Sequence, residues 1–176
     1  GFEKVYLKCR EYIEAAIINE KATILSVKEL TTGTQTDTYI NAQLNSIDVV
    51  GGATLKSFDQ FMITLAPGFA VAPVVIKLTL PEKQAIKMKP VTTLKVRESG
   101  YLKYSDLIKE ISAPILEKYP VINQRIDRNE VGRLCNGVNS ILDIKKLIDA
   151  QMGVDNELQD IINIISIFSE AGLVKL

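Results

Sequence analysis

The last fifty residues repeat one local pattern, in which a helix-capping side chain is followed by an amphipathic stretch and then by a glycine. Asp127 stands three positions before Glu130, and Ser140 stands three positions before Asp143. This capping-box spacing begins helices because each side chain bonds the backbone amide of the other residue. Asp155 is the predicted cap of a third helix. Glycines follow the three stretches at Gly137, Gly153 and Gly172. The pattern predicts three short helices and a strand-like terminus.

The segment before these helices is also helical in pattern. Gly100 closes a more β-like region, and Ser105 is a plausible cap for the helix that follows. Pro114 either kinks this helix or splits it. In the second case Ser112 caps a new helix with Pro114 in its first turn, a position that tolerates proline.

Residues 1–100 predict a mixed sheet domain with two helices. The β-branched residues Thr23, Ile24 and Val27 favour a strand, and Thr31-Thr32-Gly33 favours a turn after it. The predicted elements, in order, are a helix over 2–20, strands over 22–30, 38–44 and 47–50, a helix over 55–65, and strands over 69–80 and 91–96. The fold class expected for the whole chain is therefore α+β, with a sheet domain over 1–100 and a helical domain over 101–176.

One resemblance rests on the C-terminal motifs. The segment Asn136–Ile148, NGVNSILDIKKLI, followed by Gly153 and by EAGLVKL from Glu170, is similar to small winged-helix units of many prokaryotic regulatory proteins. The resemblance covers about residues 121–176 and implies a helix-turn-helix followed by a wing strand. Winged helices bind DNA in some families and protein in others. The sequence stops at Leu176, so one wing strand is expected and a DNA-contacting wing hairpin would be incomplete.

A second resemblance lies in the N-terminal half. A predicted strand that ends near Val50, a helix, and then the motif PGFAV at 67–71 resemble PATAN-type regulatory domains. Such domains accompany winged-helix units of this kind. The resemblance implies a regulatory role for the chain.

The residue types present restrict the chemistry. The sequence contains no histidine, which removes Ser-His-Asp and Cys-His catalysis and most zinc sites. No phosphate-binding loop, dinucleotide fingerprint, nucleophile elbow or calcium loop occurs in the sequence. Gly51-Gly52 is interpreted as a tight turn rather than as an anion site. We therefore predict a non-catalytic protein without a metal, cofactor or small-molecule substrate.

The cysteines and the hydropathy pattern predict where the protein resides. Cys9 and Cys135 stand in unrelated contexts, as two small apolar groups in a reducing compartment would. No apolar run reaches the roughly 18 residues of a membrane-spanning helix. The sequence therefore predicts a cytoplasmic protein.

Positive charge gathers in one part of a chain that is neutral overall. Lys plus Arg and Asp plus Glu number 21 each, so no global field favours nucleic acid. The segment from Lys77 to Lys103 has a net charge of +5, whereas Val131 to Leu176 has a net charge of −2. The basic segment is either a patch for phosphates or an acidic partner, or the solvated edge of a hairpin. Its candidate binding residues are Lys87, Lys89, Lys95 and Arg97.

The third C-terminal helix has an acidic outward side by its spacing. The stripe that faces the core at 3.6 residues per turn consists of Leu158, Ile161, Ile162, Ile165 and Phe168. Acidic residues repel phosphates, although the Asn and Gln residues beside them could read bases. Ile164 and Ile167 point away from the stripe, which predicts a cover from the first domain, a second copy or another protein. The partner-binding candidates are Asn156, Glu157, Gln159, Asp160, Asn163, Ile164 and Ile167.

These patterns predict a regulatory or scaffolding module that binds protein and self-associates. The alternative is a winged-helix transcription or chromatin protein that uses the basic segment for phosphates. An enzyme of unusual type, with a Ser-Lys pair or with carboxylates alone, is a third interpretation.

Overall fold

The computed structural model describes the backbone of residues 1–30 and 33–176, and their side chains except at 29, 30, 34 and 98–104. About 70% of the chain is helical, and a two-strand sheet accounts for 3%. The predicted α+β fold with an N-terminal sheet domain is therefore wrong. The chain forms two compact units, Gly1–Lys77 and Leu78–Leu176, whereas the sequence placed a boundary near residue 100. The predicted turn residues Thr31 and Thr32 lie outside the described residues.

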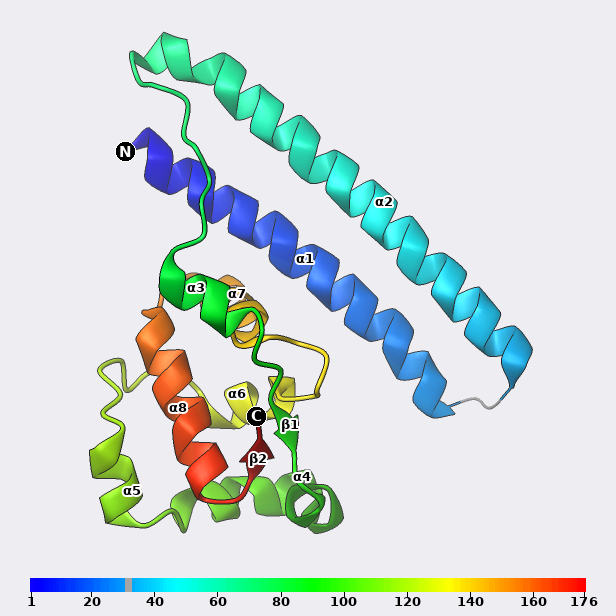
Figure 1. Ribbon diagram of the computed structural model, residues 1–176, viewed down its shortest axis with the longest axis vertical. Coiled ribbons are helices and arrows are strands. Elements are labelled where there is room, and N and C mark those ends of the chain that lie inside the picture. The colour runs from blue at the N-terminus through cyan, green and yellow to red at the C-terminus, as the bar shows by residue number, and fades with distance from the viewer. Residues whose placement is uncertain (31–32) are drawn as a thin grey trace. The chain divides into compact units, whose positions relative to one another are not determined.

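The first unit is a hairpin of two long helices. They are α1 (Phe2–Leu30) and α2 (Thr34–Leu65), and a 3-10 turn, η1 (Ala66–Phe69), follows them. Figure 1 shows α1 and α2 side by side along their length. The buried and half-buried positions of α2 recur every three or four residues, as in a helix with one packed stripe. They include Ile40, Leu44, Ile47, Gly51, Leu55, Phe58 and Met62.

The two helices approach closely at Gly51. A Cβ atom at this position would lie 2.8 Å from side-chain carbons of Ile17 on α1, so only glycine fits unless the Ile17 side chain moves. Nearer the N-terminus of α1, the ring centroids of Tyr6 and Phe58 lie 5.7 Å apart. Gly51-Gly52 is thus part of helix α2 and not the predicted turn.

Most of the predicted N-terminal strands are helical. The predicted strands at 22–30, 38–44 and 47–50 lie within α1 and α2, and only Val91–Thr92 of the predicted strand at 91–96 is a strand, β1. Residues 71–79 have no regular structure. The β-branched residues that suggested strands have a weak intrinsic preference, which packing along a helical stripe overrides.

The second unit contains six helices and the two described strands. Its elements are α3 (Leu80–Ala85), β1 (Val91–Thr92), α4 (Leu94–Lys109), α5 (Ala113–Lys118), α6 (Arg128–Leu134), α7 (Ile141–Met152), α8 (Leu158–Glu170) and β2 (Val174–Lys175). Gly100 lies inside α4 and does not close the segment. Ser112 is the N-cap residue of α5 and Pro114 stands in its first turn, so the helix is split rather than kinked.

The predicted caps position α6 and α7. The Asp127 carboxylate accepts hydrogen bonds from the first amides of α6. Ser140 and Asp143 form the capping box of α7, and Gly153 ends that helix with a φ of 66°. The N-cap residue of α8 is Glu157 and not Asp155.

A small sheet ties the start of the second unit to its end. β1 pairs antiparallel with β2, with Val91 opposite Lys175 and Thr92 opposite Val174. On its other side Val91 forms a bridge with Asn136, between α6 and α7. β1 therefore lies between two segments that come later in the sequence.

Isoleucines of α7 and α8 dominate the core of the second unit. The fully buried core residues include Val131, Ile144, Ile148, Ile161, Ile165, Phe168 and Leu173. Ile144 is fully buried, whereas Ile162, which the sequence placed in the core stripe, packs at the edge of the core and is half-buried. Among the described residues, no helix combines the length and the apolar character needed to cross a membrane.

Replacing Ile144 with alanine should destabilise the second unit by about 2 to 5 kcal/mol, because a fully buried isoleucine leaves a cavity. Urea unfolding followed by circular dichroism measures this free energy. Ile122→Ala is the matched control, since the Ile122 side chain is exposed and its loss should cost less than about 0.5 kcal/mol. Equal effects of the two substitutions would contradict the core assignment.

Candidate functional site

The structure places the predicted contact residues of α8 in two groups. Ile164 and Ile167 are 0% and 1% exposed and belong to the core of the second unit. Their predicted outward position is therefore wrong. The physical reason is that α8 is enclosed over more of its circumference than the single stripe assumed from the sequence.

The polar candidates are divided as well. Asn156 and Asp160 are buried, Asn163 is half-buried, and Glu157 and Gln159 are exposed. Buried polar groups need hydrogen-bond partners. These partners come from the segment 118–123, at the end of α5 and in the loop after it, and for Asn156 also from Asp149 of α7.

Residues 118–123 run along α8 in the opposite direction. The Lys118 ammonium lies 2.7 Å from the Glu170 carboxylate at the end of α8. Near the middle of the helix, the Asn163 amide nitrogen donates to the carbonyl oxygen of Pro120 at 2.6 Å. We call residues 118–123 the cover segment.

Asp160 holds the cover segment at the start of α8. Its two carboxylate oxygens accept hydrogen bonds from the backbone amides of Ile122, at 2.8 Å, and Asn123, at 2.9 Å. The Asp160 residue is 2% exposed. Charge-assisted bonds of this kind are about twice as strong as neutral ones, so this contact fixes the loop to the helix.

A buried chain of polar side chains extends this contact to α7. The Asn123 side chain donates to the Asn156 oxygen at 2.7 Å. The Asn156 side-chain and backbone nitrogens both donate to Asp149, and Lys145 lies 2.5 Å from the same carboxylate. The candidates Asn156 and Asp160 thus have structural partners within their own unit.

The ion pair between Lys118 and Glu170, at the C-terminal end of α8, shifts the pKa of both groups. The hydrogen bond with Glu170 raises the pKa of Lys118, and the same bond lowers the pKa of Glu170. Each group therefore keeps its charge over a wider pH range. Both side chains are exposed, so solvent screens the pair and its effect on stability is small.

The basic candidates are exposed and lie on two segments. Lys87 and Lys89 stand between α3 and β1, whereas Lys95 and Arg97 stand in the first turn of α4. Basic residues at a helix N-terminus are unfavourable toward the helix dipole. The side chain of Lys103, at the end of the basic segment, lies outside the described residues.

Three ion pairs between α1 and α2 lie on one flank of the hairpin. Asp37, Asp48 and Asp59 recur every eleven residues of α2, about three helical turns, so they share one side. Each aspartate meets a basic residue of α1. The pairs are Lys28 with Asp37 at 3.3 Å, Lys21 with Asp48 at 2.7 Å, and Arg10 with Asp59 at 3.1 Å. The hairpin therefore neutralises these charges internally.

The opposite flank of α2 is uncharged and exposed. Its residues follow a helical spacing and consist of Tyr39, Ser46, Val50, Ala53, Ser57 and Phe61. We call this set the uncharged face. Val50 is 64% exposed and Phe61 is 56% exposed.

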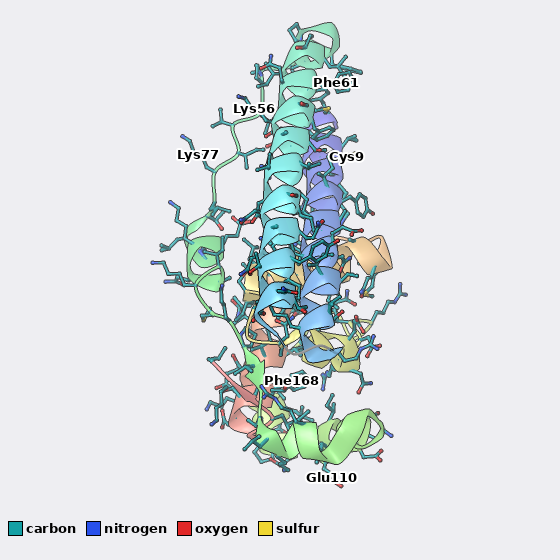
Figure 2. All side chains as sticks on the ribbon, turned by 90° about the vertical axis from the view of Figure 1, so that its right-hand side faces the viewer. Cys9, Lys56, Phe61, Lys77, Glu110 and Phe168 are labelled. Carbon is teal, nitrogen blue, oxygen red and sulfur yellow. The ribbon has the colours of Figure 1, made fainter. Side chains whose placement is uncertain are left out.

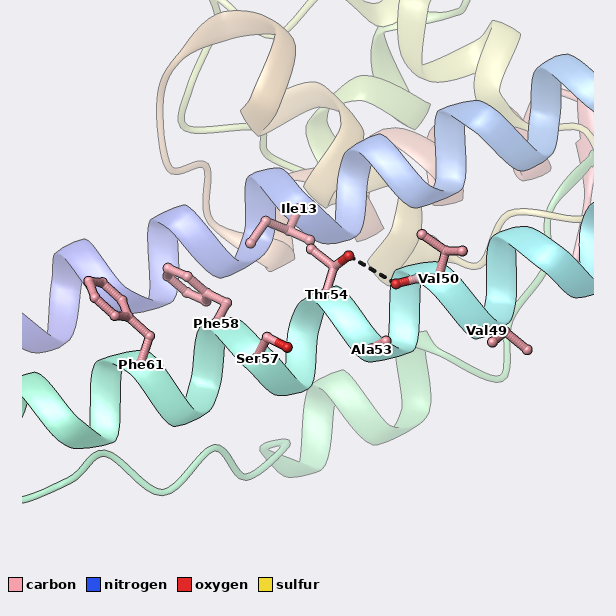
Figure 3. Close-up of a pocket in the computed structure, with 8 residues that line it drawn as sticks. All are labelled: Ile13, Val49, Val50, Ala53, Thr54, Ser57, Phe58 and Phe61. Carbon is pink, nitrogen blue, oxygen red and sulfur yellow. Dashed lines mark hydrogen bonds between the residues drawn. The ribbon is translucent and has the colours of Figure 1, made fainter.

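A shallow groove of about 620 Å³ lies on the uncharged face. Figure 3 shows Ile13 of α1 on one side of it and seven residues of α2 on the other. Thr54 turns its hydroxyl to the carbonyl oxygen of Val50 at 2.9 Å, which leaves its methyl group for the groove. The lining is therefore almost wholly apolar.

Sequence reasoning missed this face because it assigned α2 to two strands and a helix. Two signals pointed to one long helix. The apolar residues Ile40, Leu44 and Ile47 stand four and three positions apart, and the aspartates keep the eleven-residue interval. The Gly51-Gly52 pair hid both signals, because glycines are interpreted as breaks.

The titratable groups with the largest pKa shifts are not poised for catalysis. Burial raises the pKa of the Cys135 thiol to about 12. Burial and a hydrogen bond to Asp59 raise the pKa of Tyr6 to about 12. Both groups stay protonated at neutral pH, so neither acts as a base or as an activated nucleophile there. Cys9 is an exposed thiol on α1 (Figure 2).

Comparison with protein-family models, with curated proteins and with solved structures finds no match to this chain. The winged-helix and PATAN-type resemblances stay predictions. The strand expected to end near Val50, which the second resemblance used, is part of α2. Function is therefore inferred from the geometry of the two units.

Replacing Asp160 with asparagine should destabilise the second unit by about 2 to 4 kcal/mol. An amide offers one acceptor where the carboxylate offers two, so one backbone amide of the cover segment is left unbonded. Urea unfolding measures the change. Glu157→Gln is the control, because Glu157 is exposed and its side chain makes no capping bond. A loss below about 0.5 kcal/mol for Asp160→Asn would show that the cover segment is not held by this residue.

Proposed function

We propose that the chain is a non-catalytic interaction module, regulatory or scaffolding in role, whose α1–α2 hairpin makes the protein contact. The observation that carries this proposal is the uncharged, exposed face of α2. A surface helix normally carries charged residues on its solvent side. An exposed apolar patch with a groove is typical of a protein-binding surface.

The closure of α8 supports protein binding over DNA reading. A recognition helix must place free donors and acceptors in the major groove. The side chains of Asp160 and Asn163 on α8, and of Asn156 just before it, are engaged by the cover segment. Gln159 donates to Asn163 at 2.8 Å, so the polar row along this helix is already bonded within the chain.

A winged-helix DNA or chromatin protein is the second candidate. The observation in its favour is the exposed basic set Lys87, Lys89, Lys95 and Arg97. The order of α6, α7, α8 and β2, with β1 beside β2, is also compatible with a winged-helix unit. In this case phosphate contacts from the basic set would supply the affinity.

The cysteines support a location inside the cell. Cys9 and Cys135 are both free, one exposed and one buried. Free thiols persist in a reducing compartment. On this ground we propose a cytoplasmic location.

Titration of a fluorescent duplex of about 30 base pairs with the full chain tests the proposal against its alternative. We expect at most weak binding without sequence preference, with Kd above roughly 1 μM, that disappears between about 50 and 200 mM salt. The variant Gln159→Ala should bind the duplex with the same affinity as the unmodified chain. Tight, sequence-selective binding that weakens in Gln159→Ala would overturn the proposed function and establish α8 as a reading helix.

A further inference from the structure

We propose that Asn136 is a site of spontaneous deamidation, which the small sheet of the second unit holds closed. This inference goes beyond the proposed function, because it concerns a chemical modification of the loop between α6 and α7 and not the hairpin contact. Three observations support it: the reactive pair of residues, the orientation of the Asn136 side chain, and the hydrogen bond that occupies the attacking nitrogen.

Asn136 and Gly137 form the one Asn-Gly pair of the sequence. In deamidation, the backbone nitrogen of the following residue attacks the side-chain carbonyl carbon of asparagine, and a five-membered succinimide forms. The attacking nitrogen gives its proton to hydroxide, and the side-chain nitrogen takes a proton from water and leaves as ammonia. Water then opens the ring to aspartate or to isoaspartate. Glycine favours the attack because it has no Cβ and adopts the backbone conformations that ring closure needs.

The Asn136 side chain is turned toward the backbone that follows it. Its side-chain oxygen accepts hydrogen bonds from the backbone amides of Val138 and Asn139, each at 2.9 Å. The Gly137 nitrogen stands in this stretch of backbone. N–H donors on a carbonyl oxygen also stabilise the negative charge that develops there during an attack. Asn136 and Gly137 are exposed, so water can reach the pair.

A hydrogen bond from β1 holds the attacking nitrogen. The Gly137 N–H donates to the carbonyl oxygen of Pro90 at 2.8 Å, and the attack requires that this hydrogen leave. A second bond joins the same two segments, because the Thr92 N–H donates to the carbonyl oxygen of Cys135 at 3.0 Å. The strand β1 must therefore separate from the loop before Gly137 can react.

The loop needs both residues of the reactive pair. Gly137 has a φ of 79°, a conformation that favours glycine. Asn136 supplies the oxygen that satisfies two backbone amides, and aspartate offers the same kind of acceptor. Isoaspartate, by contrast, adds a carbon to the backbone and shifts the bridge between Asn136 and Val91. The aspartate product therefore keeps the loop, whereas the isoaspartate product opens it, and each adds a negative charge.

Mass spectrometry of the full chain, incubated at mildly alkaline pH with and without unfolding urea, tests this inference. Trypsin releases residues 134–145 as one peptide, in which Asn139, followed by serine, is an internal reference. In urea, Asn136 should convert faster than Asn139. In the folded chain, Asn136 should convert at least about 100-fold more slowly than in urea, because the reaction needs a local opening. Equal rates in the folded and unfolded chain, or no conversion of Asn136 in urea, would overturn the inference.

The variant Thr92→Pro tests the role of β1. It removes the N–H that bonds Cys135, and proline does not fit a central strand. The conversion of Asn136 should therefore rise at least about 10-fold over that in the folded, unmodified chain. The matched control is Val75→Pro, because Val75 is exposed in a segment without regular structure, and this variant should keep the slow rate. A Thr92→Pro variant that converts no faster than the control contradicts the proposal.

A second measurement covers the case in which Thr92→Pro does not fold. In the unmodified chain, urea below the unfolding transition should raise the hydrogen exchange of the Gly137 amide and the conversion of Asn136 in the same proportion, because both need the same opening. Conversion that rises while the Gly137 amide stays protected would show that the bond to Pro90 does not control the reaction.

Discussion

The carboxylate of Asp160 holds the cover segment against α8, and the surface of the second unit at this helix depends on that contact. It is buried and bonds the backbone amides of Ile122 and Asn123. A buried carboxylate without partners would cost several kcal/mol, so the loop and the helix stabilise each other. Through Asn123 and Asn156 the same contact reaches Asp149 on α7. The polar side of α8 is therefore bonded to other segments of its own unit.

In the proposed function, the hairpin supplies the interaction surface through a separation of charge. Close approach at Gly51 lets α1 and α2 pack along a narrow stripe. The basic residues of α1 and the aspartates of α2 meet on one flank, which leaves the other flank of α2 without charge. The three pairs neutralise their charges within the hairpin. The uncharged face of α2 gains by contact with an apolar surface.

The sequence predicted best where local chemistry decides the structure. Side-chain caps act within four residues, so the starts of α6 and α7 at Asp127 and Ser140 were predicted correctly. The sequence failed where packing decides: Gly51-Gly52 and the valines before it suggest a strand and a turn locally, yet they lie in α2, where Gly51 packs against Ile17. Ile164 and Ile167 were misplaced for a similar reason, because a helical projection cannot show that residues from another segment enclose the far side. The sequence identified the exposed basic residues correctly. Whether they bind phosphates depends on the partner, which the sequence does not encode.

The cover segment bonds to the polar side of α8. This contact is the basis for proposing protein binding over DNA binding. Hydrogen exchange of the backbone amides of Ile122 and Asn123, measured by NMR on the full chain, tests it most directly. The amides donate to a buried carboxylate, so they should exchange at least about 100-fold more slowly than an unstructured peptide. Exchange of both amides at the unstructured rate, while the amides of α8 stay protected, would show that the cover segment does not close the helix and would contradict this account.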